Sequence, residues 1–386
     1  MIIGVDVRCL QDTWRTGVGE TAWQILKSLS TFPNVKLVGF ANAAKHVDLP
    51  PNLRDVMQVV HTRIPNKLKN LCFSLKIGEP IDVTLEKKIG QKLDVLWLPN
   101  PSFVYVSGKV PVVLTVHDLA FCHYPEFFPV RGKFWYFPTV KKLLKNGLPE
   151  KSFILTSSQH TADDVVDYAP ILRNKTRAAL LGVEKEYFNS PSADSIRSTL
   201  DKFNIKKDFI LSVGTIEPRK NYKLLLEVYN NLVLKDPTYP YDLVIAGIWG
   251  WRSNDLKILY NNLPTKHRIH FLGYITVDEK KELYSSCKLF VYPSFYEGFG
   301  LPVLEAMAAG KPVVVSQTSS LPEVVGDAGL LLSPYKPEVW QEALNYLARD
   351  NDFRNEYAIK SVKQAQKFSW EKTAAIYLDV FNKLLS

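Results

Sequence analysis

The stretch Leu289–Gly310 reads LFVYPSFYEGFGLPVLEAMAAG and contains a strand, a glycine-bearing loop and the start of a helix. The apolar run before Ser294 has the length and the aromatic and β-branched content of a strand buried on both faces of a parallel sheet. Gly298 and Gly300 mark the loop, and Pro302 stands at the first helical position, which favours proline. This order predicts one unit of a parallel α/β sheet.

Similar units precede and follow this stretch. Between the predicted strands lie segments with helical spacing, for example Lys220–Lys235, Asp278–Cys287 and Pro302–Ala309. Strands that alternate with helices indicate doubly wound α/β domains. The predicted strands are Ile2–Val7, Val35–Phe40, Val95–Leu98, Val112–Val116 and Phe153–Thr156 in the first half, and Phe209–Gly214, Leu243–Gly247, Ile269–Gly273, Leu289–Ser294, Pro312–Ser316 and Gly329–Leu332 in the second.

The polar segment 189–207, interrupted by Pro191, separates the two series of strands and predicts a domain boundary. A chain of 386 residues has the length of about two domains. The predicted fold class is therefore α/β, with two Rossmann-like doubly wound domains that face each other. Ligands of such domains bind in the crevice at the carboxyl ends of the strands. An amphipathic helix, Phe368–Leu385, closes the sequence.

Composition excludes several classes of protein. Hydrophobic residues make up 46% of the chain and charged residues 23%, which rules out a disordered tail, a fibrous repeat and a disulfide-stabilised miniprotein. The four cysteines stand far apart in the sequence, which argues against a zinc site and fits a reducing cytoplasm. The N-terminus lacks a signal-peptide pattern, and no window is apolar enough for a transmembrane helix. We therefore expect a cytoplasmic protein whose contact with a membrane is peripheral at most.

The net charge of +9 is distributed unevenly. Residues 1–190 hold 24 basic and 17 acidic residues, whereas residues 191–386 hold 24 and 22. A basic first domain suits an anionic partner such as nucleic acid, a membrane surface or a phosphorylated substrate. The alternative is a well-solvated surface without a specific partner.

The loop and helix start at 298–302 have the features of a phosphate site. The first N–H groups of a helix lack partners and carry partial positive charge, and glycines let a phosphate approach the backbone. Glu297 in the loop and Glu305 about one turn into the predicted helix could both face this crevice, where carboxylates accept sugar or ribose hydroxyls. The alternative is that both are ordinary surface acids.

Two further segments carry candidate ligand-binding side chains. In Val213–Asn221, VGTIEPRKN, Arg219 and Lys220 open a predicted helix, where cations are unfavourable unless an anion such as a diphosphate lies between them. In the segment VVLTVHD, His117 can hydrogen-bond a substrate hydroxyl or phosphate. The alternatives are a solvated basic pair and a core histidine satisfied by Asp118.

The segment Thr16–Ala22, TGVGETA, matches the G-x-G-x-x-A pattern of dinucleotide-binding domains but departs from it twice. Gly17 stands about eight residues beyond the predicted strand, and the next strand, which ends at Asn42, is not followed by an acid for the ribose. Both departures disfavour NAD and an oxidoreductase. The sequence also contains no Walker A, HExxH or GxSxG motif and no clear Asp-x-Asp pair.

In their order along the chain, these segments resemble the retaining glycosyltransferases of family 4, which have the GT-B fold. The resemblance covers essentially the whole chain. Its most specific part is EGFGLPVLE, with seven residues between Glu297 and Glu305. The other matching segments are the glycine loop with Gly17 and Gly19, HDL (His117–Leu119), SQHTADD (Ser158–Asp164), GTIEPRKN (Gly214–Asn221), SSLPEVVGDAG (Ser319–Gly329) and FSWEK (Phe368–Lys372).

The resemblance implies an acceptor-binding domain at 1–190 plus 370–386 and a donor-binding domain at 191–369, with the C-terminal helix crossing back onto the first domain. It implies transfer of glucose or mannose from UDP-glucose or GDP-mannose, with retention of configuration and without a metal or other cofactor. The acceptor would be a saccharide or polyprenyl-linked saccharide of cell-surface polysaccharide synthesis. A non-catalytic nucleotide-sugar-binding scaffold is the second possibility, which the intact motifs disfavour.

The resemblance also implies a role for each matching position. His117 would face the transferred sugar, Glu297 would bind its hydroxyls, and Arg219 and Lys220 would hold the diphosphate. Glu305 would bind the ribose. The other implied donor-binding positions are Gly17, Gly19, Gly214, Tyr274, Ile275, Phe299, Gly300 and Leu301.

Two basic segments of the first domain are interleaved with apolar residues, which suits an anionic bilayer or a polyprenyl diphosphate. The alternative is that their apolar residues belong to the core. No motif supports nucleic-acid binding. The segment Asn66–Gly78 holds Lys67, Lys69 and Lys76 with Leu68, Leu71, Phe73 and Leu75, and the segment Val130–Leu148 holds Arg131, Lys133, Lys141, Lys142 and Lys145 with Phe134, Trp135, Tyr136, Phe137, Leu143 and Leu144.

Overall fold

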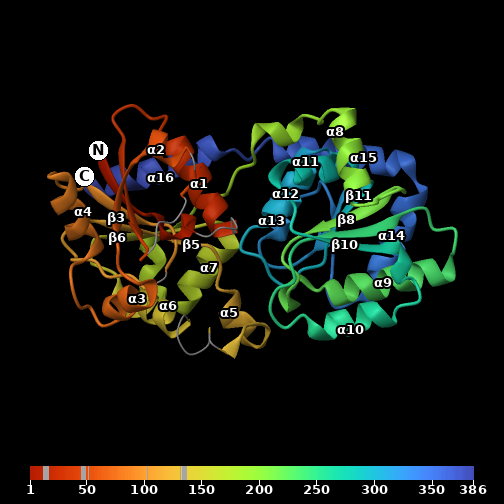
Figure 1. The fold of residues 1–386 in the computed structure, drawn as a ribbon, viewed down its shortest axis with the longest axis horizontal. Helices are drawn as coiled ribbons and strands as arrows, with labels where there is room; N and C mark the ends of the chain where they lie inside the picture. Colours follow the sequence, from red (N-terminus) through yellow and green to blue (C-terminus); the bar gives the residue numbers. More distant parts are fainter. Residues whose placement is uncertain (12–16, 45–48, 51, 102, 131, 133–136) are drawn as a thin grey trace. The chain divides into compact units, whose positions relative to one another are not determined.

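Two parallel sheets, one in each of two units of the chain, organise the fold (Figure 1). The computed structural model describes residues 1–11, 17–44, 49–50, 52–101, 103–130, 132 and 137–386. Unit 1 consists of Met1–Leu119, Val130–Gly182 and Ser369–Ser386, and unit 2 consists of Ala120–Pro129 and Val183–Phe368.

In the described part of unit 1, seven parallel strands lie in the order β3-β2-β1-β4-β5-β6-β7. The order reverses between β1 and β4, which is the type of switch point where ligands of doubly wound sheets bind. The strands are β1 (Ile2–Asp6), β2 (Lys36–Asn42), β3 (Gln58–Thr62), β4 (Val95–Leu98), β5 (Val112–Val116), β6 (Ser152–Thr156) and β7 (Thr176–Ala178), and the α-helices are α1 (Gly17–Leu29), α2 (Leu53–Val56), α3 (Asn66–Ser74), α4 (Ile81–Ile89), α6 (Phe137–Lys142), α7 (Gln159–Tyr168) and α16 (Trp370–Leu385).

Unit 2 has a six-stranded parallel sheet in its described residues, in the order β10-β9-β8-β11-β12-β13. Its order reverses between β8 and β11. Helices α9, α10 and α14 lie on one side of this sheet, and α8, α11, α12 and α15 lie on the other (Figure 1). The strands are β8 (Phe209–Val213), β9 (Asp242–Ala246), β10 (Ile269–Gly273), β11 (Leu289–Tyr292), β12 (Val313–Ser316) and β13 (Leu330–Leu332), and the α-helices are α5 (Ala120–His123), α8 (Ala193–Lys202), α9 (Tyr222–Lys235), α10 (Asn254–Asn262), α11 (Val277–Ser286), α12 (Leu301–Ala308), α13 (Leu321–Val325), α14 (Pro337–Arg349) and α15 (Asn351–Ala365).

All the strands predicted from apolar runs are present, and the predicted α/β class is confirmed. The sequence reasoning missed β3 and β7, which are the two edges of the first sheet. In β3 only Val60 is fully buried, and the three residues of β7 are half-buried or exposed. A continuous apolar run is the mark of a strand covered on both faces, and these edge strands lack that burial.

The C-terminal helix α16 belongs to unit 1, where it packs on α1, as the resemblance implied. Tyr377 of α16 is buried with its ring edge-on to Trp97, at 5.1 Å between ring centres. Its hydroxyl lies 2.8 Å from the Thr115 hydroxyl, which also accepts a hydrogen bond from Trp97 Nε1 at 2.9 Å. This buried network satisfies its polar groups and fixes α16 on the sheet, because an unpaired buried donor or acceptor is costly.

The boundaries between the two units differ from those that the sequence predicted. The crossings lie after Gly182 and after Phe368, whereas the sequence placed them after residues 190 and 369. The segment Ala120–Pro129 was assigned to the first domain but packs with unit 2. Phe127 stacks on Tyr124 and Phe295, with ring centres 5.2 and 5.3 Å apart, and its carbonyl accepts a hydrogen bond from Trp251 Nε1 at 2.8 Å. Aromatic stacking therefore holds this segment, since each such ring buries a large apolar area.

No helix in the described residues is both long enough and apolar enough to cross a membrane.

Gly182 tests the packing between the end of the segment Val130–Gly182 and the start of α16. A Cβ on Gly182 would lie 2.1 Å from Trp370 N and 2.3 Å from Ser369 C, both backbone atoms that cannot rotate away. Overpacking of this kind costs about 1–3 kcal/mol, so we expect Gly182→Ala to lower the melting temperature measured by differential scanning fluorimetry. Gly17→Ala is the control, because the Cβ there meets open space. Equal melting temperatures for the two variants would contradict this packing.

Candidate active site

The loop after β8 places Arg219 and Lys220 at the switch point of the second sheet. Pro218, Arg219 and Lys220 form a single 3₁₀ turn, and Asn221 is left-handed with φ 54°. Helix α9 begins only at Tyr222. The sequence had predicted that the two cations open the helix. They instead precede it, because the left-handed Asn221 separates their turn from α9.

The loop after β11 carries Glu297, and backbone contacts hold it in place. The Glu297 N–H donates to Ser319 Oγ at 2.8 Å, and Ser320 Oγ donates to the Glu297 carbonyl at 2.9 Å. Ser319 itself is left-handed, with φ 50°. These bonds join the Glu297 loop, which follows β11, to the loop after β12, so the position of the carboxylate depends on the ends of both strands.

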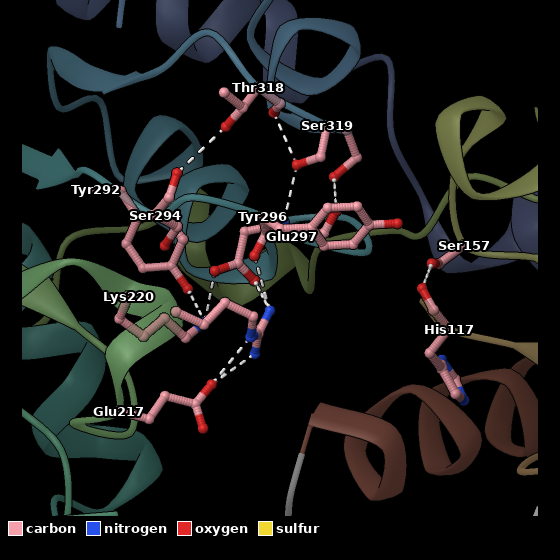
Figure 2. A network of polar contacts seen from close by, with 12 residues as sticks. His117, Ser157, Glu217, Lys220, Tyr292, Ser294, Tyr296, Glu297, Thr318 and Ser319 are labelled. Carbon is pink, nitrogen blue, oxygen red and sulfur yellow. Dashed lines mark hydrogen bonds and ion pairs between the residues drawn. The ribbon is translucent and has the colours of Figure 1, made fainter. Parts of the chain in front are cut away.

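Glu297 lies between the two cations (Figure 2). Lys220 Nζ donates to Oε1 at 2.7 Å, and Arg219 Nη1 donates to Oε2 at 3.1 Å. The same Nη1 donates to the Tyr296 carbonyl at 2.9 Å, while Arg219 Nε donates to Glu217 at 3.0 Å. The carboxylate of Glu297 and the ammonium of Lys220 are buried, and Arg219 is nearly so. The structure thus brings together three of the four side chains predicted to be catalytic.

The charges of this network determine the protonation of Glu297. Burial by itself would raise the pKa of Glu297, but the charges of Arg219 and Lys220 outweigh it and lower the pKa below its ordinary value. Burial lowers the pKa of Lys220, and the neighbouring Glu297 carboxylate opposes that shift. The lowered pKa favours the ionised carboxylate of Glu297, which lies within ion-pair distance of both Arg219 and Lys220, and this is the arrangement that satisfies buried charges.

Tyr292 at the end of β11 completes the surroundings of Lys220. Lys220 Nζ donates to the Tyr292 hydroxyl at 2.5 Å and lies 4.9 Å from the centre of its ring. These contacts and the one to Glu297 use two of the three ammonium protons, and no described residue accepts the third. The sequence quoted Tyr292 only as part of a strand, because its role depends on where the ammonium of the next loop lies.

Glu305 on α12 has two partners from the adjacent helix α11. Lys280 Nζ donates to its Oε1 at 2.6 Å, and the Tyr284 hydroxyl donates to Oε2 at 3.0 Å. Tyr284 is fully buried and Glu305 nearly so. Lys280 and Tyr284 were not identified from the sequence, although they stand four residues apart, the helical spacing that puts two side chains on one face.

The start of α12 is shaped by Gly300, which is left-handed with φ 104° and directly precedes Leu301. A Cβ at this position would lie 2.7 Å from Leu321, so both conformation and space favour glycine. Phe299 is buried and Leu301 half-buried. The helix has no side-chain cap, Pro302 has no N–H, and the Val303 N–H already donates to the Gly300 carbonyl at 2.9 Å, so among the described residues of the first turn only the Leu301 N–H is left for another acceptor.

The remaining predicted donor-binding positions are distributed over both units. Gly214 follows β8 with φ 155°, and the Tyr222 hydroxyl donates to its carbonyl at 3.1 Å. Tyr274 is exposed and Ile275 half-buried, just after β10. Gly17 and Gly19 lie in the first turn of α1, while Thr16 and the loop before it lie outside the described residues.

His117 lies in unit 1, immediately after β5, and its neutral form is well defined. Its Nε2 donates to the Pro99 carbonyl at 2.8 Å, and its own carbonyl accepts from Ser157 Oγ at 2.7 Å. Burial lowers the pKa of His117 below its ordinary value, which favours the neutral ring. With the proton on Nε2, Nδ1 is left as an acceptor. The partner of Nε2 is therefore the Pro99 carbonyl and not Asp118.

Within the described residues, no group of three His, Cys, Asp or Glu side chains gathers as metal ligands do.

Comparison with known proteins agrees with this arrangement. Residues 197–364 match the family described as Glycosyl transferases group 1. The O-antigen chain mannosyltransferase B of Escherichia coli is 27% identical over 378 residues, which is 96% of each chain. The serotype-specific mannosyltransferase WbdA of Escherichia coli is 32% identical over 271 residues, 68% of this chain but 33% of WbdA. HepE of Anabaena, solved with UDP and glucose, superimposes with a TM-score of 0.75 over 99% of both chains at 17% identity.

The paired parallel-sheet units and the matches to known proteins define a glycosyltransferase of GT-B fold. Residues 197–364 carry the match to the Glycosyl transferases group 1 family, and the whole chain resembles an O-antigen chain mannosyltransferase. The predicted resemblance to glycosyltransferases of GT-B fold is thereby confirmed. The chain spans only about a third of the length of WbdA, so the match to WbdA concerns one part of that protein.

The lowered pKa of Glu297 predicts how the network responds to acid. The pKa of an unfolded glutamate is about 4.3. The pKa of Glu297 in the folded protein is lower, so the unfolded state binds more protons in this pH range. The contribution of the ionised carboxylate is therefore complete above the unfolded pKa and is lost as the pH falls through the folded pKa. We expect the melting temperature of wild type to be higher than that of Glu297→Gln at pH 7, and the difference between the two to shrink at more acidic pH. A gap that stays constant down to about pH 3 would contradict the assignment.

Proposed function

We propose that this chain is a retaining glycosyltransferase of family 4 that transfers mannose from GDP-mannose to a saccharide or lipid-linked saccharide acceptor in cell-surface polysaccharide synthesis. The observation that carries the proposal is the buried Lys220–Glu297–Arg219 network at the β8/β11 switch point. Mannose is favoured over glucose because the two relatives with long matches, mannosyltransferase B and WbdA, are mannosyltransferases.

In this proposal the two cations stabilise the leaving diphosphate. The third proton of the Lys220 ammonium can donate to a phosphate oxygen while the other two stay on Tyr292 and Glu297. A buried cation fixed before the donor arrives stabilises developing negative charge without reorganisation. The Leu301 N–H at the uncapped start of α12 can donate to the same diphosphate or to the sugar.

In unit 2, Glu297 would contact the transferred sugar and Glu305 the ribose. Glu297 is held ionised, so it can accept hydrogen bonds from sugar hydroxyls. The neutral ring of His117 can accept one at Nδ1. Lys280 and Tyr284 orient the Glu305 carboxylate, which would keep part of its acceptor capacity for ribose hydroxyls.

The chemistry follows from these roles. The bond between the anomeric carbon and the diphosphate oxygen breaks, and the acceptor hydroxyl forms a new bond on the same face of the sugar. The hydroxyl proton passes to the departing diphosphate oxygen, so configuration is retained without a covalent enzyme intermediate. We propose that Arg219 and Lys220 supply the positive charge for this step and that no metal is needed.

UDP-glucose is the second candidate donor, because the structural neighbour HepE was solved with UDP and glucose. A non-catalytic nucleotide-sugar-binding scaffold remains as an alternative function, and it requires a donor to bind without being turned over. An NAD-dependent oxidoreductase is disfavoured by the placement of Gly17 far from the end of β1.

A donor panel and one lysine variant test this proposal. We expect GDP-mannose, and not UDP-glucose, UDP-galactose, ADP-glucose or NAD, to raise the melting temperature of wild type by ligand linkage. Lys220→Ala should abolish that rise and reduce sugar transfer or donor hydrolysis by about 100-fold or more, as removal of a transition-state donor does. Lys223→Ala is the matched control, since Lys223 is exposed and pairs only loosely with Glu227.

The transfer assay also distinguishes the alternatives. Excess EDTA should leave the rate unchanged. Donor binding without any turnover would point to the scaffold, and stabilisation by UDP-glucose alone would replace mannose with glucose. Unchanged activity of Lys220→Ala would contradict the role of the network.

Peripheral contact with an anionic membrane is part of the proposal, and its location is α3. Leu68, Leu71, Leu75 and Ile77 are exposed on α3 and just after it, although Phe73 is buried. The second basic segment is less suitable, because Phe137 and Leu144 are buried in the core. Its members Arg131, Lys133 and Phe134–Tyr136 lie outside the described residues.

We expect wild type to sediment with liposomes that contain anionic lipid and to be released by high salt, since screening weakens attraction to the surface. Leu71→Glu should reduce the bound fraction because it removes apolar contact and adds repulsion. Leu234→Glu is the matched control, a similarly exposed leucine on α9 of unit 2. Absence of wild-type binding at low salt would remove the membrane from the proposal.

A further inference from the structure

Lys69 points to the inner side of α3, away from the exposed leucines, and is an unusual cation. Only 7% of its surface is exposed. Its ammonium lies 4.4 Å from the centre of the Phe73 ring and 5.7 Å from that of Phe40. In the described part of the chain it has neither a hydrogen bond nor an ion pair. Lysines this buried are almost always paired with an anion.

Arg8, just beyond β1, lies beside the same two rings, but its charge is matched. Its Cζ is 5.4 Å from the centre of Phe73 and 5.9 Å from that of Phe40. Its guanidinium pairs with Asp6 at 2.6 Å, and Nη1 donates to Asn70 Oδ1 at 3.3 Å. Arg8 therefore has a carboxylate partner, whereas no described carboxylate forms an ion pair with Lys69.

Among the described residues, Glu79 is the carboxylate whose charge acts on Lys69, and it does not form an ion pair with it. Glu79 acts on Lys69 only at a distance, since its own ion pair is with Lys87 at 3.4 Å and it accepts from the Thr84 hydroxyl at 3.0 Å. Burial and the nearby Arg8 charge lower the pKa of Lys69. Lys69 keeps 7% of its surface exposed, so the side chain is not sealed from solvent.

The position of Lys69 in the fold fits a ligand site. Asp6 ends β1 and Asn42 ends β2, and α3 follows β3, so the cations lie at the carboxyl edge of the first sheet. This edge is where doubly wound sheets bind ligands. Contacts with aromatic rings compensate only part of the desolvation of an ammonium, whereas an anion that hydrogen-bonds to it compensates far more.

We propose that Lys69, with Arg8 beside it, is a subsite for a phosphate group of the acceptor. The inference rests on the proposed function only in taking unit 1 as the acceptor-binding unit. The ammonium of Lys69 would donate to a phosphate oxygen, and Arg8 would add to the positive potential. The phosphate belongs either to a lipid-linked diphosphate, whose chain could lie along exposed Leu68 and Leu71, or to a phosphorylated sugar.

A purely structural role of Lys69 makes the opposite prediction for stability. If the ammonium serves only to pack on Phe40 and Phe73, Lys69→Met should lower the melting temperature of the unliganded protein. If the site awaits an anion, removing an uncompensated buried charge should keep or raise that temperature, as at binding sites that sacrifice stability for function. A clear fall in the melting temperature of Lys69→Met would overturn the proposal.

The binding test uses inorganic pyrophosphate in a background that lacks the donor-site lysine. In Lys220→Ala, we expect pyrophosphate still to raise the melting temperature. Adding Lys69→Met should abolish this rise, Lys69→Arg should retain part of it, and Lys67→Met, an exposed lysine of the same helix, should leave it intact. Stabilisation that survives Lys69→Met would overturn the proposal. Because this assay needs no transfer, its outcome does not depend on the proposed function.

Kinetics identifies the source of the phosphate. With acceptors that carry a phosphate, Lys69→Met should raise KM by about tenfold or more, the effect of one charge-assisted hydrogen bond, and leave kcat nearly unchanged. With the same saccharide lacking phosphate, KM should not change. A KM effect with both lipid-linked and lipid-free phosphorylated acceptors indicates a sugar phosphate, and an effect with the lipid-linked acceptor alone indicates the carrier diphosphate. An equal effect on phosphate-free acceptors would overturn the proposal.

Discussion

The carboxylate of Glu297, buried between Arg219 and Lys220, is the interaction on which the second unit depends. Each of the three charges would be costly alone, and together they satisfy one another. Because the partners come from loops after different strands, β8 and β11, the ion pairs also fix the distance between those loops. Ser319 and Ser320 extend the same constraint to the loop after β12 through the backbone of Glu297.

The two units differ in whether their buried cations have ion-pair partners among the described residues. In unit 2 the important cations are paired, since Arg219 has Glu217 and Glu297, and Lys280 has Glu305. In unit 1 the cation Lys69 is buried against aromatic rings, and none of the described residues forms an ion pair with it. The excess basic residues of the first half are therefore not only a solvated surface. One of them is inside, at the edge of the sheet where ligands of this fold class bind.

Much of the fold could be predicted from sequence because a strand covered on both faces must be apolar throughout. The runs at Val112–Val116 and Leu289–Tyr292 are of this kind, whereas the edge strands Gln58–Thr62 and Thr176–Ala178 carry polar residues and were missed. The candidate site was found in part. Glu297, Arg219 and Lys220 stand in glycine- and proline-marked loops, but the partners Tyr284, Lys280 and Tyr292 lie in ordinary helix and strand patterns.

The sequence by itself determined the α/β class, the alternation of strands and helices, and the residue types at the loop ends, because apolar periodicity and glycine or proline act over a few neighbouring positions. Tertiary structure decided which charges meet. It joined Glu297 to Lys220 across 77 positions and placed Lys69 against the ring of Phe73, with no ion pair to a carboxylate in the described part of the chain. It also assigned the segment Ala120–Pro129 to the second unit through aromatic stacking. Pairing of buried charges depends on distances between loops from different strands, and these distances exist only once the sheet has formed.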